Sequence, residues 1–226
     1  MEFDPSSQWH NAHVTMAAGW LMTGGKVVYH IAAQPRERVR DQLRRLGVGT
    51  VEELEGLHEM DPQLTLVLTD WYSATIGRKS QDHWSNFRSL KVADLSIDWA
   101  QGEKDISGLF QQPGPPVLRI LDNVSCLARF NDEKAWVEFV ITRLIPRATK
   151  WNQVTIIGLM RGLHSDWVYK NLEGTADGVI DFRLEEATEE TQDLMRIRSM
   201  RSVGFDRKWH QLNVAANSEV TLGKSN

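Results

Sequence analysis

The sequence has little cysteine and no long apolar run. Cys126 is the only cysteine, so no internal disulfide can form, and a lone thiol beside an apolar stretch is most simply a small buried residue. No run of about 18 apolar residues occurs, which argues against a membrane-spanning helix. The chain opens Met-Glu-Phe-Asp-Pro, without a basic and then apolar leader. We therefore expect a soluble, cytoplasmic protein with no membrane partner.

An excess of positive charge is also missing. The formal net charge is −4 and the pI is about 6.0, so the chain has no general attraction to nucleic acid or to an anionic membrane. Five arginines between residues 36 and 45 alternate with Glu37 and Asp41, which is typical of a solvated helix face. With 226 residues, 41% of them hydrophobic, the chain is expected to form one domain over residues 1–226.

Short apolar runs alternate with stretches of helical periodicity along most of the chain. This alternation predicts an α/β fold with a mainly parallel central sheet, helices on both of its faces and a C-terminal antiparallel hairpin. Strands are expected at residues 26–32, 64–68, 116–121, 154–159 and 178–184, and the hairpin at 194–200 with 209–214. Helices are expected at 13–22, 35–46, 50–58, 91–100, 131–146 and 165–172, with an exposed loop at 73–86 and an acidic turn at 185–190.

The chain is organised around the apolar run that begins at Pro116. Four of the five residues after this proline are large aliphatics, and the run ends in Asp122 and Asn123. The run therefore predicts a buried strand that delivers polar groups at its carboxyl end. Ligands of open α/β sheets bind at that edge. A carboxylate there is a candidate magnesium ligand, and it is equally a candidate helix cap.

Several strings, taken in their order and spacing, resemble a KaiC-like ATPase domain of the RecA superfamily, of the type common in archaea. They are GKVVY at residues 25–29, PRER at 35–38, ILDNVS at 120–125, ADGVI at 176–180, RSMR at 198–201 and WH at 209–210. The resemblance covers nearly the whole chain and implies a three-layer RecA-like fold. It also implies that Asp122 stands at the Walker B aspartate and that a strand precedes the phosphate loop, where Met1 leaves almost no room for one.

The phosphate loop of that family has no counterpart here. Such a loop needs glycines for its curled backbone, a lysine for the β and γ phosphates and a hydroxyl for Mg²⁺. The equivalent residues are 3–10, where Pro5 keeps the family's place. The positions of Gly, Gly, Lys and Ser/Thr are taken by Ser6, Gln8, Trp9 and His10. Trp9 is expected to fill the space that the phosphates occupy in the family.

The family's catalytic glutamate pair is missing as well. Ala33 and Gln34 stand in those two positions, and neither side chain can act as a general base. In the family's Lys-Met-Arg motif, which acts across a subunit interface, Ser199 replaces the lysine and Arg201 remains. We therefore predict no catalytic residue and no ordinary ATP hydrolysis.

The resulting hypothesis is a non-catalytic, KaiC-like regulatory or scaffold module. It would act, as in signal transduction, by assembling with itself or with an active related ATPase, with Arg201 at the interface. No cofactor or metal is expected; the alternative is weak binding of ATP and Mg²⁺, with Asp122 as the metal ligand. The residues of the degenerate nucleotide pocket are Pro5, Ser6, Ser7, Gln8, Trp9, His10, Gln34, Asp122 and Asn123.

A second hypothesis is a recombination accessory that binds single-stranded DNA, as the related RadA paralogues imply. Basic residues near aromatic ones motivate it, and they define a possible partner-contact loop of Arg78, Lys79, Arg161 and His164. The overall acidity of the chain disfavours this hypothesis.

Two other constellations carry weaker chemistry. His10 and His13 are spaced to share a metal at a helix start, but no acidic or sulfur partner has a recognisable spacing. Ser125, His164 and Asp166 supply the residue types of a hydrolase triad without the glycine frame of a nucleophile elbow.

Overall fold

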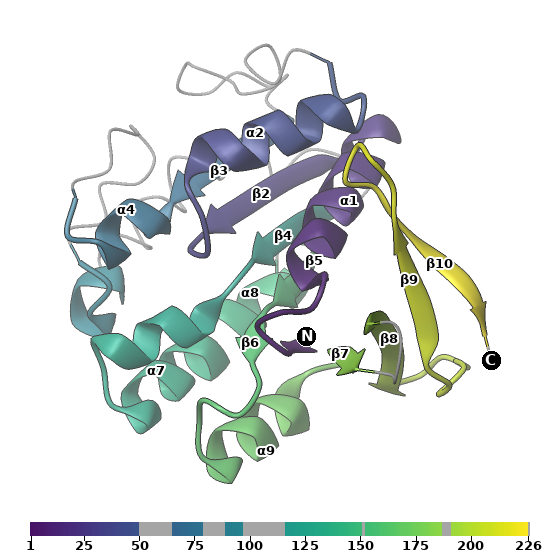
Figure 1. The fold of residues 1–226 in the computed structure, drawn as a ribbon. Helices are drawn as coiled ribbons and strands as arrows, with labels where there is room; N and C mark the ends of the chain where they lie inside the picture. Colours follow the sequence, from purple (N-terminus) through teal and green to yellow (C-terminus); the bar gives the residue numbers. More distant parts are fainter. Residues whose placement is uncertain (50–64, 79–88, 97–115, 151, 187–190, 226) are drawn as a thin grey trace.

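The computed structural model describes residues 1–49, 65–78, 89–96, 116–150, 152–186 and 191–225. They form a three-layer α/β arrangement in which strands are covered by helices on both faces (Figure 1). This is the fold class that the alternating pattern predicts. Within these ranges no helix is long and apolar enough to cross a bilayer.

The first sheet, sheet B, is entirely parallel. Its strands are β2 (Lys26–Ile31), β3 (Leu66–Asp70), β4 (Val117–Leu121) and β5 (Gln153–Ile157), in the order β3-β2-β4-β5. Every residue of β4 is buried, as expected for the inner strand of a sheet that is covered on both sides.

The second sheet, sheet A, is mixed and follows the order β10-β9-β8-β7-β1-β6. Its strands are β1 (Glu2–Phe3), β6 (Leu159–Met160), β7 (Gly178–Glu186), β8 (Thr191–Met200), β9 (His210–Val214) and β10 (Val220–Ser225). β1 lies parallel to β6 and β7, whereas β7 to β10 pair in antiparallel fashion. Only Gly158 separates β5 from β6, so the chain passes directly from one sheet into the other.

Two helices cover one face of sheet B. They are α1 (Trp9–Met22) and α2 (Arg36–Arg45), whose buried apolar residues pack on β2, β3 and β4. The β9–β10 hairpin lies beside α1, where the Val220 N–H donates to the Thr15 hydroxyl (Figure 1). The contact joins the C-terminal strands to the N-terminal helix.

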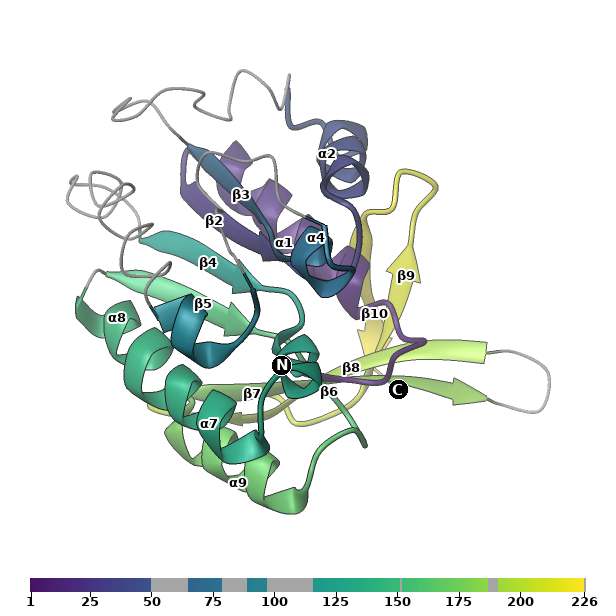
Figure 2. The same ribbon diagram turned by 90° about the vertical axis from the view of Figure 1, so that its left-hand side faces the viewer.

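The opposite face carries the remaining described helices, of which α7, α8 and α9 lie side by side in Figure 2. A second apolar cluster, with Trp71 and Trp136 among its largest members, fills the space under them. The elements are α4 (Trp71–Thr75), η1 (Val124–Arg129), α7 (Glu133–Phe139), η2 (Val140–Leu144), α8 (Ile145–Lys150) and α9 (Asp166–Thr175).

Most predicted elements are present, with four differences. α1 begins at Trp9 instead of residue 13, and the loop expected from residue 73 begins only after α4. The helix expected to kink or end at Pro146 continues as α8, because the π-helical turn η2 widens the backbone just before the proline. β7 extends through Glu186 into the expected acidic turn.

Other predictions fall partly or wholly outside the described residues. The helix expected at 50–58 lies outside them, and so do residues 79–86 of the exposed loop and 187–190 of the acidic turn. Of the helix expected at 91–100, residues 92–96 are described and are helical.

Candidate functional site

The loop between β1 and α1 contains most of the residues that the resemblance aligns with the phosphate loop. It spans residues 4–8 and is held closed by its own atoms: the Ser7 N–H and the Ser7 hydroxyl both donate to the Asp4 carbonyl oxygen, at 3.0 and 2.7 Å. The Asp4 N–H donates to the carbonyl oxygen of Phe182 on β7. Pro5 and Ser6 are exposed, whereas Ser7 is buried. The Ser7 hydroxyl therefore stabilises the turn.

Trp9 lies in the core beside this loop. Its ring stacks on Phe3 with centroids 3.9 Å apart and an interplanar angle of 13°, and only 7% of the residue is exposed. Ala12, Phe182 and Leu212 complete the cluster. The position at which the resemblance implies a phosphate-binding lysine is thus an apolar packing site.

A carboxylate lies at the N-terminus of α1. Gln8 is the N-cap residue, and its N–H donates to Oδ1 of Asp193 at 3.0 Å. Partial burial raises the pKa of Asp193, and the hydrogen bonds from Gln8 oppose that shift. A helix N-terminus attracts anions because its first N–H groups point outward without partners. The Asp193 carboxylate therefore occupies a position that would otherwise suit a phosphate group.

His10 and Gln34 stand where the resemblance implies a hydroxyl and a glutamate, and both side chains form hydrogen bonds with Gln42 of α2. Oε1 of Gln42 lies 3.1 Å from His10 Nε2 and accepts from the Gln34 amide at 3.1 Å, and the Gln42 amide donates to Asn11. Burial lowers the pKa of His10 to about 4, so the ring is neutral at physiological pH. The cluster offers hydrogen bonds but no positive charge.

Asp122 is turned toward the backbone of the neighbouring strand end. The side chain is fully buried and accepts from the Ala32 N–H at 2.8 Å and the Ala33 N–H at 3.4 Å. Burial raises the pKa of Asp122 to about 7, although these N–H bonds lower it. The Asn123 side chain accepts from the Ser125 N–H and caps η1. Asp122 thus ties the tip of β4 to the end of β2, and Asn123 closes a local turn.

His10 and His13 do not converge on a shared site. The His13 side chain is fully buried with Nε2 2.9 Å from the Met1 sulfur, and burial lowers its pKa well below the usual value. Across the described ranges, no group of three or more His, Cys, Asp or Glu side chains is arranged to hold a metal ion.

The predicted contact loop is described at Arg78, Arg161 and His164, and Arg161 is engaged within the fold. Arg161 forms ion pairs with Asp181 at 2.9 Å and with Glu2 at 3.7 Å, inside a network that sequence reasoning did not find. Arg78 is exposed, and Lys79 lies outside the described residues. The contacts of Arg161 argue against its use by an external partner.

The network around Arg161 also holds two strands of sheet A together. Arg196 on β8 pairs with the buried Asp181 at 2.8 Å, and Arg198 pairs with Glu2 and Glu173. The predicted interface arginine, Arg201, is exposed and donates to the carbonyl oxygen of Gly174 at 2.6 Å. Its part in an interface stays a prediction.

Ser125 and His164 meet, but with a different acid from the one considered in the sequence. His164 Nε2 lies 2.8 Å from the Ser125 hydroxyl, and Nδ1 lies 3.7 Å from Glu133, whereas Asp166 is an exposed residue at the start of α9. Only 2% of Ser125 is exposed, and its oxygen also accepts the Met160 N–H. The trio therefore fixes the loop after β6 and presents no accessible nucleophile.

Comparison with known proteins gave matches at the level of structure. No family model and no curated protein matches the sequence. A KaiC-like protein from the hyperthermophilic archaeon Pyrococcus horikoshii superposes with a TM-score of 0.66 and 16% identity, covering 99% of this chain and 87% of that one. The chain has a KaiC-like, RecA-type fold.

A second structural neighbour is an uncharacterized protein from the same archaeon, solved in complex with an unknown peptide. It superposes with a TM-score of 0.71 and 15% identity, covering 100% of this chain and 90% of that one. At these identities the similarity establishes the fold alone.

Proposed function

We propose that this chain is a non-catalytic RecA-type module that acts by binding other polypeptides, including copies of itself or an active related ATPase. The observation that carries the proposal is the hydrogen bond from the Gln8 N–H to the Asp193 carboxylate at the N-terminus of α1. An internal anion there competes with any phosphate for the same backbone donor.

Electrostatics disfavour a triphosphate at this loop. Residues 3–10 contain no lysine or arginine. Two like unit charges 4 Å apart repel by about 1 kcal/mol in bulk water and about 4 kcal/mol near a protein surface. Each phosphate brought to the α1 N-terminus would meet this repulsion from Asp193, and residues 3–10 supply no lysine or arginine to offset it. The residues present therefore do not fit a magnesium triphosphate.

The groups needed for turnover are also engaged or absent. The Asp122 carboxylate accepts two backbone N–H groups, and Ala33 and Gln34 stand where the resemblance implies glutamates. Losing a general base or a charge-stabilising group costs factors of roughly 10² to 10⁴ each. These losses support a protein that uses its RecA-type fold to present binding surfaces and not to hydrolyse nucleotide.

Polypeptide binding has support from the neighbour that was crystallised with an unknown peptide. We extend peptide binding to this chain as part of the proposal. DNA binding gains no comparable support, since Arg161 is paired with internal carboxylates and the His164 side chain is buried.

The test measures nucleotide binding and hydrolysis together with assembly. Calorimetry with ATP and ADP, each with and without Mg²⁺, should show no binding heat, and phosphate release should stay at the buffer rate. The mass in solution, measured alone and with a KaiC-like ATPase, should show association. Steady phosphate release that Asp122→Ala abolishes would overturn the proposal, and Asp41→Asn on the surface of α2 is the matched control for that variant.

A further inference from the structure

One face of sheet A carries charged side chains in place of an apolar layer. Phe182 on β7 packs with Trp9 in the core on the side of α1. Because side chains alternate between the two faces of a strand, the neighbouring Asp181 and Arg183 face the opposite way. Arg196 on β8 is the cross-strand partner of Asp181 and shares that side. We call this side of β7, β8 and β9 the outer face of sheet A.

Trp209 lies on the outer face with two guanidinium groups against its ring. In the antiparallel pairing of β8 with β9, Met195 is opposite His210, so the next residues, Arg196 and Trp209, lie beside each other. The Arg183 guanidinium carbon is 4.1 Å from the ring centroid, and that of Arg196 is 4.5 Å away. A cation is attracted to the face of an aromatic ring. One half-buried ring therefore holds both arginines, and 32% of each arginine side chain is exposed.

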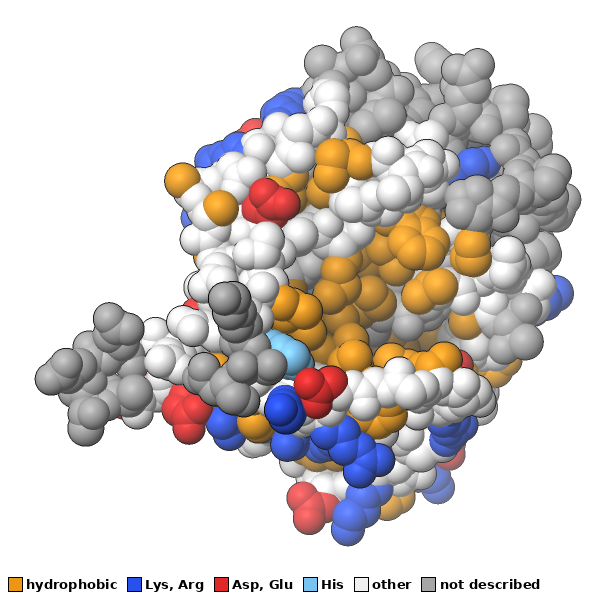
Figure 3. All heavy atoms as spheres, turned by 90° about the vertical axis from the view of Figure 1, so that its right-hand side faces the viewer, with side chains coloured by type: hydrophobic (Ala, Val, Ile, Leu, Met, Phe, Trp, Pro, Cys, Tyr) orange, Lys and Arg blue, Asp and Glu red, His pale blue; other side chains and the backbone are white. Residues whose placement is uncertain are grey.

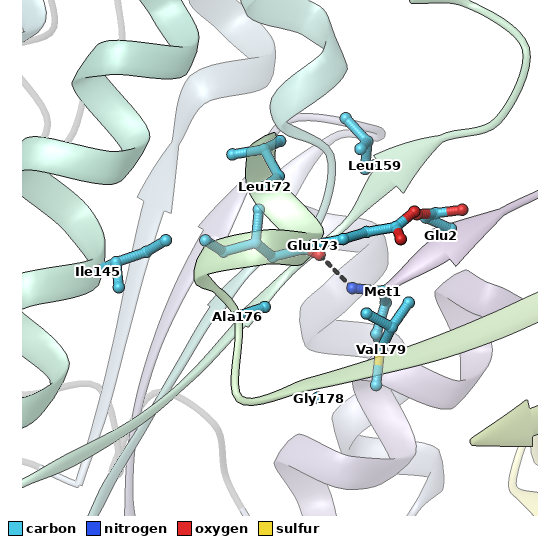
Figure 4. A pocket seen from close by; sticks show the side chains of 10 residues that line it. Met1, Glu2, Ile145, Leu159, Leu172, Glu173, Ala176, Gly178 and Val179 are labelled. Atoms are coloured by element: carbon cyan, nitrogen blue, oxygen red, sulfur yellow. Dashed lines mark hydrogen bonds between the residues drawn. The ribbon is translucent and has the colours of Figure 1, made fainter. Parts of the chain in front are cut away.

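Buried carboxylates fix the arginines from below. Asp181 is fully buried and accepts from Arg196 Nε at 2.8 Å. Glu2 on β1 is buried beside it and accepts from Arg198, which also donates to Glu173. Glu2 and Glu173 lie close together at one end of a small pocket (Figure 4). The negative charge of this network lies mainly inside the protein, whereas its guanidinium groups reach the surface.

The loop between β8 and β9 adds positive charge to this side of the molecule. Its exposed charged residues are Arg201, Arg207 and Lys208, against the single acidic residue Asp206. The Arg207 guanidinium carbon lies 5.4 Å from the ring centroid of Phe205, which is a second contact between an arginine and an aromatic ring. Figure 3 shows Lys and Arg side chains gathered in the lower part of the molecule, where sheet A lies. The chain as a whole has a net charge of −4, so this basic side is an exception.

We infer that the outer face around Trp209 is a docking surface for an acidic segment of a partner protein, whose carboxylates pair with Arg183 and Arg196. The docking surface is formed by Arg183, Arg196, Lys208 and Trp209. The inference deepens the proposed function, on which it rests, by naming the chemistry of the polypeptide and the place where it binds.

The two arginines keep hydrogen-bond donors for such a partner. A guanidinium group has five N–H donors. Within the described part of the chain, the Arg183 side chain donates only to Glu185, and the Arg196 side chain only to Asp181. A planar guanidinium binds a carboxylate through two parallel hydrogen bonds. Because Asp181 and the Trp209 ring already hold Arg196 in place, pairing with a partner costs this side chain little further conformational entropy.

The distribution of charge favours a short acidic segment over nucleic acid. The Glu185 side chain is 52% exposed and lies 3.0 Å from Arg183, and Asp206 is exposed in the loop. A continuous phosphate backbone would therefore meet fixed negative charges on this surface, in a chain that is acidic overall. A segment with a few carboxylates can avoid them. We expect Asp or Glu on both sides of an apolar residue, which can contact the Trp209 ring.

The probe is a fluorescein-labelled peptide, Gly-Glu-Asp-Phe-Asp-Glu-Gly, and its control carries Gln and Asn in place of Glu and Asp. Fluorescence anisotropy with the full chain at low salt should show saturable binding of the acidic peptide and at least tenfold weaker binding of the control. Salt at about 1 M should weaken the acidic peptide at least fivefold, because the Debye length falls to about 3 Å. Equal affinities of the two peptides would overturn the inference. Tighter binding of a labelled single-stranded oligothymidylate would overturn it in favour of nucleic acid.

Two pairs of variants locate the contact. Arg183→Gln should weaken binding of the acidic peptide at least fivefold, whereas Arg45→Gln, at an exposed position of the arginine-rich helix α2, should leave binding within twofold. Trp209→Ala should also weaken binding at least fivefold. Its control is Trp167→Ala on α9, since 44% of Trp167 is exposed. Equal effects within either pair would contradict the docking surface, and thermal melting checks that all four variants fold.

Chemical labelling tests the same surface without a substitution. Phenylglyoxal modifies arginine side chains, and mass spectrometry reads the modified positions. Saturating acidic peptide should slow the modification of Arg183 and Arg196 and leave that of Arg38 and Arg45 unchanged. Protection of the two arginines on α2 in place of those on sheet A would overturn the inference.

The mass in solution and phosphate release are measured in parallel. If the chain self-associates and Arg183→Gln dissociates the oligomer, the occupant is a second copy, which contradicts a separate partner. Association with other polypeptides without binding of the acidic peptide overturns the docking surface alone. Steady phosphate release together with binding of the acidic peptide overturns the proposed non-catalytic function alone.

Discussion

Sheet B and the region around β1 organise their strands in opposite ways. The inner strands of sheet B, β2 and β4, pair on both edges along their full length and carry almost no exposed side chain. β1 spans two residues, and it pairs only with residues 159–160 of β6 and 181–182 of β7. The comparison indicates that sheet B contributes more to the stability of the domain than the region around β1 does.

The largest expected effect tests how much sheet B contributes to stability. Ile120→Ala removes a fully buried side chain from β4 and should lower the free energy of unfolding by about 2 to 5 kcal/mol. Val154→Ala on the exposed face of β5 should cost less than about 1 kcal/mol. Urea unfolding of both variants measures the difference. Similar losses would mean that the edge strand β5 is packed as tightly as the inner strand β4.

A smaller effect on stability is expected at Trp9, where the resemblance implies a lysine. Trp9→Lys breaks the stack on Phe3 and should destabilise the fold by about 3 kcal/mol, because a large aromatic leaves the core. It should not restore phosphate release, since Asp193 and Ala33 are unchanged. Gain of ATP hydrolysis in this variant would show that one side chain alone had silenced the site.

The Asp122 carboxyl group makes stability depend on pH. Its pKa rises from 3.8 in the unfolded chain to about 7 in the fold, so between these values the folded state holds a proton that the unfolded state releases. The contribution of Asp122 to the free energy of unfolding therefore falls as the pH rises from about 4 to 7, and stays low above. Asp122→Asn removes this dependence and should gain melting temperature relative to the natural chain between pH 5 and pH 8. A relative loss at pH 8 would mean that the ionised carboxylate stabilises the fold.

The smallest effect concerns the anion at α1. Asp193→Asn removes one charge from a partly exposed position and should change the free energy of unfolding by less than about 1 kcal/mol. Sulfate should then raise the melting temperature of the variant more than that of the natural chain, because the negative charge that repels an external anion from the α1 N-terminus is gone. Asp41→Asn controls for the change in net charge. Equal responses to sulfate would mean that the charge of Asp193 does not oppose anion binding at the N-terminus of α1.

Sheet B could be predicted from the sequence because its signals are local. β2 and β4 are apolar runs bounded by glycine or proline, and Asp132 is the N-cap of α7 at the expected place. β1 carries no periodic signal in two residues, and β10 gives only a weak one, so the sequence did not reveal them.

The site was only partly visible in the sequence because its main contacts join distant residues. Gln8 and Asp193 are 185 positions apart, and nothing in the residues around Asp193 marks it as the partner of a loop N–H. The same holds for Glu133, which approaches His164 from another helix. The absence of lysine from residues 3–10 and of glutamate from residues 33–34 can be seen in the sequence. The position of the Asp193 carboxylate at the N-terminus of α1 cannot.

A crystal structure of the chain soaked with a non-hydrolysable ATP analogue and Mg²⁺ tests the central claim most directly. The account predicts that the Gln8 nitrogen stays within hydrogen-bond distance of Asp193 and that no phosphate density appears between Pro5 and His10. A phosphate oxygen bound to the Gln8 nitrogen, with the Asp193 side chain displaced, would contradict it.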